Sequence, residues 1–168
     1  GRESALPLED RAVVPSPKVS TYDQTPEMSA RAITDKLMET LPKYSFCVCN
    51  FSNADMVGHT GVYDVAVKAC EFVDQCLGRI VKRLENLDTT LVLTADHGNS
   101  EIMFNDFGQP HTAHTTSPVP FLIWKKNSAA LTLRQDQDIG LKDIAPTILE
   151  LIGLAVPSGW EGKSLIKK

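Results

Sequence analysis

The chain has 168 residues, 42% of them hydrophobic and 23% charged, and its formal net charge at pH 7 is −4. This length suffices for one domain with a hydrophobic core. The negative charge argues against nucleic acid as a partner, because phosphate binding needs a clustered basic surface. No apolar run approaches the roughly 20 residues that span a bilayer, so we expect no membrane partner. The four cysteines match no zinc-ligand spacing and are expected to be free thiols, which fits a cytoplasmic protein.

The first half of the chain predicts two helices on either side of a short strand. Residues 25–41 are expected to form a helix, because Pro26 suits a first helical position and apolar residues then recur at intervals of four. The apolar run at 45–51 predicts a short buried strand. Residues 62–84 carry apolar side chains at spacings of three and four throughout, which predicts a long amphipathic helix.

The second half predicts three strands and one helix. Two apolar runs, at 89–95 and 119–124, are expected to be buried strands, and 162–166 a last strand. Residues 141–153 predict a helix that Pro146 interrupts early. Nearly continuous apolar strands that alternate with helices indicate an α/β fold with a mostly parallel sheet flanked by helices.

Side chains that can bind metal ions gather in three loops beside the predicted strands. The loops contain all four histidines of the chain and two aspartates: Asp55, His59, Asp96, His97, His111 and His114. Ligands collect at the carboxyl ends of the strands in such sheets, so the pattern favours a single site at one edge. Carboxylate and imidazole donors without a thiolate favour Mn²⁺, Zn²⁺, Co²⁺ or Mg²⁺. Two such ions about 3.5–4 Å apart can assist a phosphoryl displacement.

Each loop also has an ordinary structural interpretation. Asp55 could cap a helix beside a surface histidine, and the stretch "DHGN" is a common kind of turn. His111 and His114 could both be loop histidines bonded to backbone, and for His111 this is the favoured interpretation. The adjacent Asp96 and His97 leave the backbone in different directions, so they could serve one ion or two. The combination of three loops favours a metal site.

Five stretches in the same order resemble the cofactor-independent (2,3-bisphosphoglycerate-independent) phosphoglycerate mutases, a family of the alkaline-phosphatase superfamily. They are "VPSPKVSTYDQTPEMSA", "NADMVGHTG", "TADHGN", "HTAHTTSPVPF" and "DIAPTILELIG". The resemblance runs from "GRE" at residue 1 to the final "GKSLI". It implies an alkaline-phosphatase-like fold. It also implies an enzyme that interconverts 3-phosphoglycerate and 2-phosphoglycerate through a phosphoserine intermediate. Two divalent ions are implied, Mn²⁺ foremost, with Mg²⁺, Co²⁺ or Zn²⁺ as alternatives.

By this resemblance, Asp55, His59 and His114 hold one ion, and Asp96 and His97 hold the other. In the family the second ion also binds an aspartate near the N-terminus and the nucleophilic serine, and a separate transferase domain grips the substrate. These parts find no match here. Residues 1–168 are therefore expected to be a C-terminal segment of the metal-binding phosphatase domain, a partial domain without its N-terminal segment and the inserted transferase domain. No catalytic residue is assigned in this chain, and its substrate-binding residues are unknown.

Counting ligands leads to the same expectation independently. Asp55, His59 and His114 make a three-ligand site with an open position, which is usual for a catalytic ion, whereas Asp96 and His97 are only two. The isolated chain is therefore expected to be inactive and to need the missing N-terminal part of the same enzyme as its partner. The alternatives are another phosphomutase or phosphatase of the superfamily, or a non-catalytic metal-binding module left by truncation.

Overall fold

The computed structural model describes residues 4–127 and 131–167, so the "GRE" stretch at the N-terminus lies outside the described residues. The chain divides into two compact units. The first, called the helical unit below, comprises Gly1–Asn86 and His97–Pro118. The second, the sheet unit, comprises Leu87–Asp96 and Val119–Lys168. The boundary between them falls between Asp96 and His97, which the sequence had paired as ligands.

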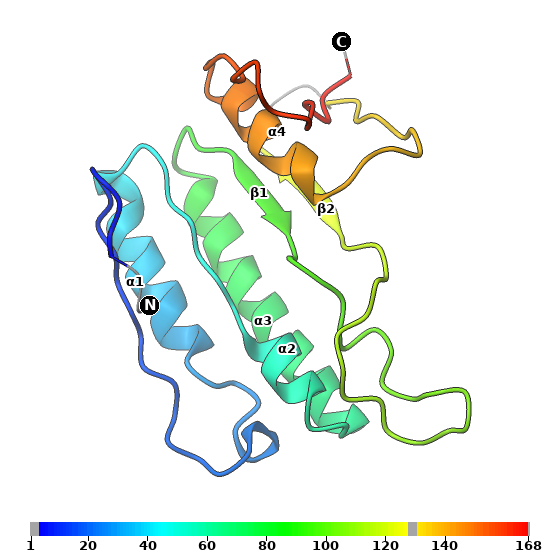
Figure 1. The fold of residues 1–168 in the computed structure, drawn as a ribbon. Coiled ribbons are helices and arrows are strands. Elements are labelled where there is room, and N and C mark those ends of the chain that lie inside the picture. The colour runs from blue at the N-terminus through cyan, green and yellow to red at the C-terminus, as the bar shows by residue number, and fades with distance from the viewer. Residues whose placement is uncertain (1–3, 128–130, 168) are drawn as a thin grey trace. The chain divides into compact units, whose positions relative to one another are not determined.

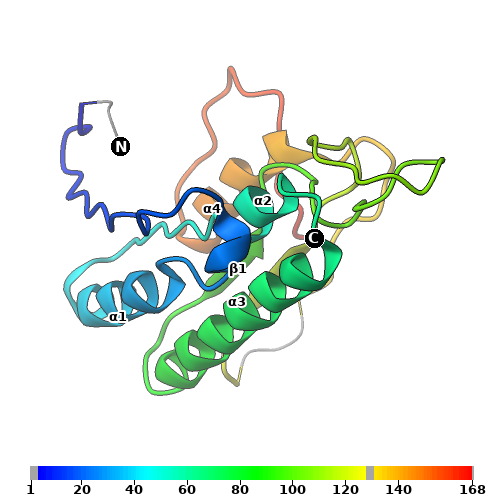
Figure 2. The ribbon, with the colours of Figure 1, turned by 90° about the horizontal axis from the view of Figure 1, so that it is seen from below.

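The helical unit is built on α3 (Tyr63–Leu84), as the periodicity of 62–84 predicts. Helix α1 (Ala30–Thr40) lies alongside it (Figures 1 and 2). Short α2 (Asn53–Gly58) packs against the first half of α3, where small alanine side chains allow a close approach. The core residues there are Val57, Ala66, Ala69 and Met103. Among the described residues, no helix combines the length and the apolar character that crossing a bilayer requires.

Helix α1 begins five residues later than the sequence predicts. Residues 25–29 form turns, and Met28 has a left-handed backbone (φ 44°) that a helix cannot contain. The buried Asn53 holds this turn, because its amide Nδ2 donates to the carbonyl oxygens of Pro26 (2.8 Å) and Glu27 (2.9 Å). A contact between residues 26 apart in sequence thus overrides a local helix signal.

The strand predicted at 45–51 does not form in the described chain. These residues form no regular secondary structure, and the side chains of Phe46 and Val48 are 56% and 82% exposed. A strand needs a neighbour to satisfy its backbone groups, and an apolar pattern cannot supply one.

The sheet unit contains β1 (Leu91–Thr94) and β2 (Phe121–Trp124), so the runs 89–95 and 119–124 are strands as predicted. The two pair antiparallel, from Leu91 opposite Trp124 to Thr94 opposite Phe121. The expectation of a mostly parallel sheet is therefore not confirmed by the described strands. An apolar run indicates burial of a strand but not the direction of its partner.

Helix α4 (Ile144–Leu151) follows a turn of 3₁₀-helix, η3 (Leu141–Asp143). Pro146 does not interrupt the helix, which is a correction to the sequence prediction. It lies in the first turn of α4, where a backbone N–H has no helical acceptor to lose. The run 162–166 forms an isolated bridge, Leu133 opposite Ile166, instead of a strand.

The buried Asp143 connects the run 162–166 to the start of α4 through hydrogen bonds. Its carboxylate accepts hydrogen bonds from the backbone N–H groups of Gly140 (2.9 Å) and Lys163 (2.7 Å). Thr147 donates its hydroxyl to the Asp143 carbonyl oxygen and accepts the backbone N–H of Leu165 (2.8 Å). These contacts replace the ladder that a true strand would have made.

We expect Asp143→Ala to lower the free energy of unfolding by about 2–3 kcal/mol, because it leaves two backbone N–H groups without their charged acceptor. Asp138→Ala is the matched control, since Asp138 is 89% exposed and forms its ion pair with Lys142 at the surface. That change should leave the free energy of unfolding nearly unchanged, because an exposed ion pair contributes little. Urea unfolding followed by circular dichroism measures both, and equal losses would contradict the anchoring role.

Candidate metal centre

Asp55 and His59 lie one turn apart at α2, four residues apart on the same helix face. Their side chains meet, with 3.1 Å between Asp55 Oδ1 and His59 Nε2. Because α2 has only six residues, its position comes from packing on α3 and not from its own helical stability.

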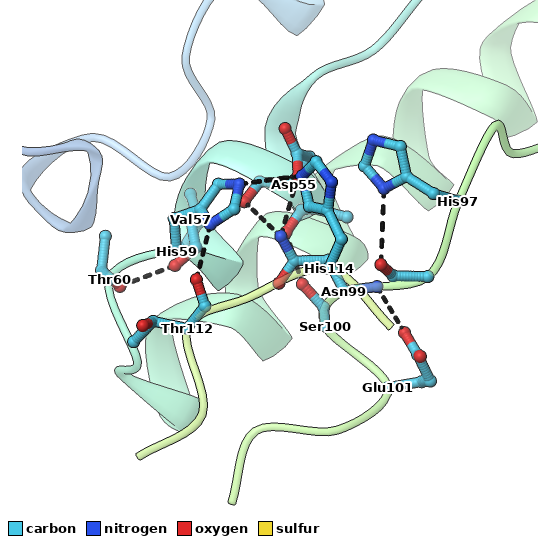
Figure 3. A network of polar contacts seen from close by, with 12 residues as sticks. Asp55, Val57, His59, Thr60, His97, Asn99, Ser100, Glu101, Thr112 and His114 are labelled. Atoms are coloured by element: carbon cyan, nitrogen blue, oxygen red, sulfur yellow. Dashed lines mark hydrogen bonds and ion pairs between the residues drawn. The ribbon is translucent and has the colours of Figure 1, made fainter. Parts of the chain in front are cut away.

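His114 reaches the same point from a loop 55 residues further along the chain (Figure 3). Its Nε2 lies 3.0 Å from Asp55 Oδ1 and 3.1 Å from His59 Nε2. The three donor atoms therefore form a nearly equilateral triangle, which is the one group of three or more possible metal ligands found among the described residues. The side chains of Asp55, His59 and His114 are 32%, 37% and 51% exposed, so a small molecule can reach the triangle.

The hydrogen bond on the far side of His59 decides which ring nitrogen carries the proton. Nδ1 lies 2.7 Å from the carbonyl oxygen of Thr112, which can only accept, so Nδ1 is the donor. A neutral His59 then presents the lone pair of Nε2 to Asp55 Oδ1. Two acceptors 3.1 Å apart need a proton or a cation between them. When each metal–ligand distance is about 2.1 Å, neighbouring ligands of one ion lie about 3.0 Å apart at right angles and about 3.4 Å apart in a tetrahedron, so the triangle is close to the size that a divalent ion needs.

Two loops of the helical unit converge on this triangle. The loop after Gly98 and the loop that carries His114 are joined by a backbone bridge, in which Thr115 donates its N–H to the Gly98 carbonyl oxygen (2.9 Å). Glu101 accepts the backbone N–H of Asn99 (2.7 Å) and the hydroxyl of Thr115. The sequence did not identify Asn99, Glu101 or Thr115, since single polar residues beside a motif carry no spacing signal.

The other residues named from the sequence lie around this centre in different ways. The ring of His97 stacks on that of His114, with centroids 3.7 Å apart, and its Nδ1 lies 3.4 Å from the Gly98 carbonyl oxygen. Asp96 belongs to the sheet unit. The backbone N–H of His111 donates to the carbonyl oxygen of Met103 (2.9 Å), and His111 is not part of the triangle. The structure thus brings together three of the five predicted ligands, and the roles of Asp96 and His97 stay predictions.

Comparison with known proteins shows the family to which the chain belongs. Residues 1–156 match the family described as "Metalloenzyme superfamily". The chain belongs to the metalloenzyme superfamily. Within it, the chain is 49% identical over all its 168 residues to the 2,3-bisphosphoglycerate-independent phosphoglycerate mutase of Moorella thermoacetica, of which it covers 32%. It is 53% identical over 95% of its length to the enzyme of the same name from Clostridium botulinum, of which it covers 31%.

A solved structure is also similar to this superfamily member. It is the crystal structure of Leishmania mexicana phosphoglycerate mutase at low cobalt concentration, with a TM-score of 0.81 and 33% sequence identity. The match covers 92% of this chain and 31% of the Leishmania chain. The chain therefore spans about a third of the length of the relatives that it matches.

Glu101 is held ionised in this metalloenzyme-superfamily chain. Burial opposes the charge of Glu101, but hydrogen bonds from Thr115, its own backbone N–H, Ser117 and the backbone of Asn99 outweigh it and lower its pKa to about 2. Because this pKa lies below the ordinary value of 4.5, the ionised Glu101 stabilises the fold above pH 4.5, and this contribution disappears as the pH falls toward 2.

We expect Glu101→Gln to lower the free energy of unfolding by about 1 kcal/mol at pH 7, after allowance for solvent screening. The difference from wild type should shrink between pH 4.5 and 2, where wild type loses the same interaction. Urea unfolding of the metal-free chain at several pH values measures this. Glu71→Gln, on the exposed face of α3, is the control and should leave the curve unchanged. A pH-independent difference for Glu101→Gln would contradict the assignment.

Proposed function

We propose that Asp55, His59 and His114 bind a divalent metal ion. The observation that carries this is the triangle of Oδ1 and two Nε2 atoms with sides of 3.0–3.1 Å. Membership of the metalloenzyme superfamily supports it. One carboxylate and two imidazoles favour Mn²⁺, Co²⁺ or Zn²⁺ over Mg²⁺, and we retain Mn²⁺ as the first candidate.

We further propose that the longer protein interconverts 3-phosphoglycerate and 2-phosphoglycerate through a phosphoserine intermediate. The support is the name of the relatives and their identity of about 50% with this chain. When bound, the ion supplies positive charge that stabilises a transferred phosphoryl group. Asp55, His59 and His114 hold that charge at an exposed point, while the hydrogen bond from His59 to Thr112 fixes the direction of one imidazole.

A second ion would use Asp96 and His97. Two protein ligands hold an ion poorly, so we infer that further ligands and the nucleophilic serine come from the rest of the enzyme. Its relatives are about three times as long as this chain, which supports this inference. No residue of this chain is assigned as the nucleophile. Ser100, for example, donates its hydroxyl to the backbone carbonyl of Ala54. A cytoplasmic location stays a prediction from the sequence.

His114→Ala is expected to weaken Mn²⁺ binding by more than about 100-fold, because losing one of three ligands should cost more than the 10–100-fold typical of a supporting partner. Isothermal titration calorimetry of the 168-residue chain measures this. His111→Ala is the matched control, a histidine of the same loop that is not part of the triangle, and it should bind as wild type does. Equal affinities for His114→Ala and His111→Ala would remove the basis of the metal assignment.

The activity can be tested in a chimera in which residues 1–168 replace the matching third of the Moorella thermoacetica relative. We expect the chimera to interconvert the two phosphoglycerates in a coupled assay, and His114→Ala to abolish this turnover. The chain alone should show none. Two results would contradict the proposed function: turnover by the chain alone, or a folded, metal-binding chimera without turnover.

A further inference from the structure

Asn99 makes the closest polar contact from another loop to the ligand oxygen of Asp55. Its side chain is buried, and Nδ2 lies 2.8 Å from Asp55 Oδ1 and 3.2 Å from the Asp55 backbone carbonyl oxygen. Oδ1 is the same carboxylate atom that faces His59 and His114. One amide group thus joins the side chain of Asp55 to its own backbone (Figure 3).

Only one of the two possible orientations of the Asn99 amide group fits against Asp55. Both atoms that it contacts there are acceptors, so the nitrogen must point toward them. Its Oδ1 is buried and has no hydrogen-bond partner among the described residues. Leaving an acceptor buried without a partner costs about 1–3 kcal/mol of stability. Asn99 therefore destabilises the fold at this atom, which suggests that its side chain serves a purpose other than stability.

The absence of a side chain at Gly58 leaves room for the Asn99 amide. A Cβ built on Gly58 would lie less than 3.0 Å from both Asn99 Oδ1 and Ser100 Oγ, closer than real Cβ atoms come to their neighbours. The space that a side chain at position 58 would need is therefore occupied by the side-chain carbonyl of Asn99 and the hydroxyl of Ser100. This explains physically why a glycine stands between Asp55 and His59 in α2, because any larger residue would displace the amide from the ligand.

The backbone of Asn99 is fixed by the contact that also holds the His114 loop. Its N–H donates to Glu101 Oε2 (2.7 Å), and the other oxygen of Glu101 accepts the hydroxyl of Thr115, the residue after His114. A continuous series of contacts thus runs from Asp55 through Asn99, Glu101 and Thr115 to the loop of the third ligand.

We propose that Asn99 is a positioning residue for the metal centre, and that Gly58 makes this role possible. Asn99 fixes the rotation of the Asp55 carboxylate so that Oδ1 stays in the triangle, and its N–H occupies one lone pair of Oδ1 while leaving another for the cation. This inference rests on the proposed binding of a metal ion by Asp55, His59 and His114. Outer partners of this kind typically contribute 10–100-fold to metal affinity.

The test compares Asn99→Ala with Asn53→Ala by calorimetric titration of Mn²⁺ into the full chain. Asn53 is a matched control, because it too is a buried asparagine whose Nδ2 donates to two oxygens, but both belong to backbone carbonyls away from the triangle. Asn99→Ala should weaken Mn²⁺ binding about 10–100-fold. Asn53→Ala should lower the urea midpoint of the metal-free chain and leave the affinity unchanged. Asn99→Ser, which is too short to reach Asp55, repeats the test with less loss of packing.

Gly58→Ala offers an independent check from the other side of the contact. Its methyl group should displace Asn99 and weaken Mn²⁺ binding to a similar extent. In the double variant Gly58→Ala/Asn99→Ala the amide is absent and the methyl group meets only the Ser100 hydroxyl among its close contacts, so the combined loss of affinity should be smaller than the product of the two single losses. Such non-additivity is the signature of two residues that act through one contact.

Two results would overturn the inference while leaving the metal site itself intact. One is wild-type affinity in Asn99→Ala and Asn99→Ser, and the other is an equal loss in Asn53→Ala. In either case the proposed function stands if His114→Ala still abolishes binding. Failure of the wild-type chain to bind Mn²⁺ would overturn both proposals.

Discussion

The close approach of Asp55 Oδ1 to the Nε2 atoms of His59 and His114, at 3.0–3.1 Å, is the constraint on which the helical unit is organised. Two atoms with lone pairs cannot stay so close without a proton or a cation between them. The three atoms therefore share either a proton, as in a hydrogen bond, or a cation. Thr112 fixes the ring of His59 from behind, and the stacked ring of His97 limits how far His114 can turn.

The positions of Asp55 and His59 depend on the packing of α2 against α3. Helix α2 is too short to be stable alone, and it is held because Val57 is fully buried against Ala66 and Ala69 of α3. The side chains of Asp55, His59 and His114 are thus partly exposed, while the residues that hold α2 in place are buried, an arrangement that lets small molecules reach a rigid site.

The division into two units separates the predicted ligands in an informative way. Asp55, His59, His97 and His114 all belong to the helical unit, whereas Asp96 is the last residue of a segment of the sheet unit. The triangle of Asp55, His59 and His114 lies within the helical unit, whereas the two further predicted ligands, Asp96 and His97, are assigned to different units. This agrees with a chain that spans about a third of its relatives, and it makes the first ion the natural one to measure in the chain alone.

The sequence by itself determined what depends on neighbours along the chain. The periodicity of 62–84 predicted α3, and the residues gathered in three loops included the three side chains that meet, since residue type and local spacing need no tertiary contact to be seen. Only the tertiary structure decided the late start of α1, the unpaired run at 45–51 and the antiparallel pairing of β1 with β2. It also decided the contact of Asn99 with Asp55. Each of these depends on a partner many residues away, and the pattern of one segment carries no record of which partner it meets or from which direction.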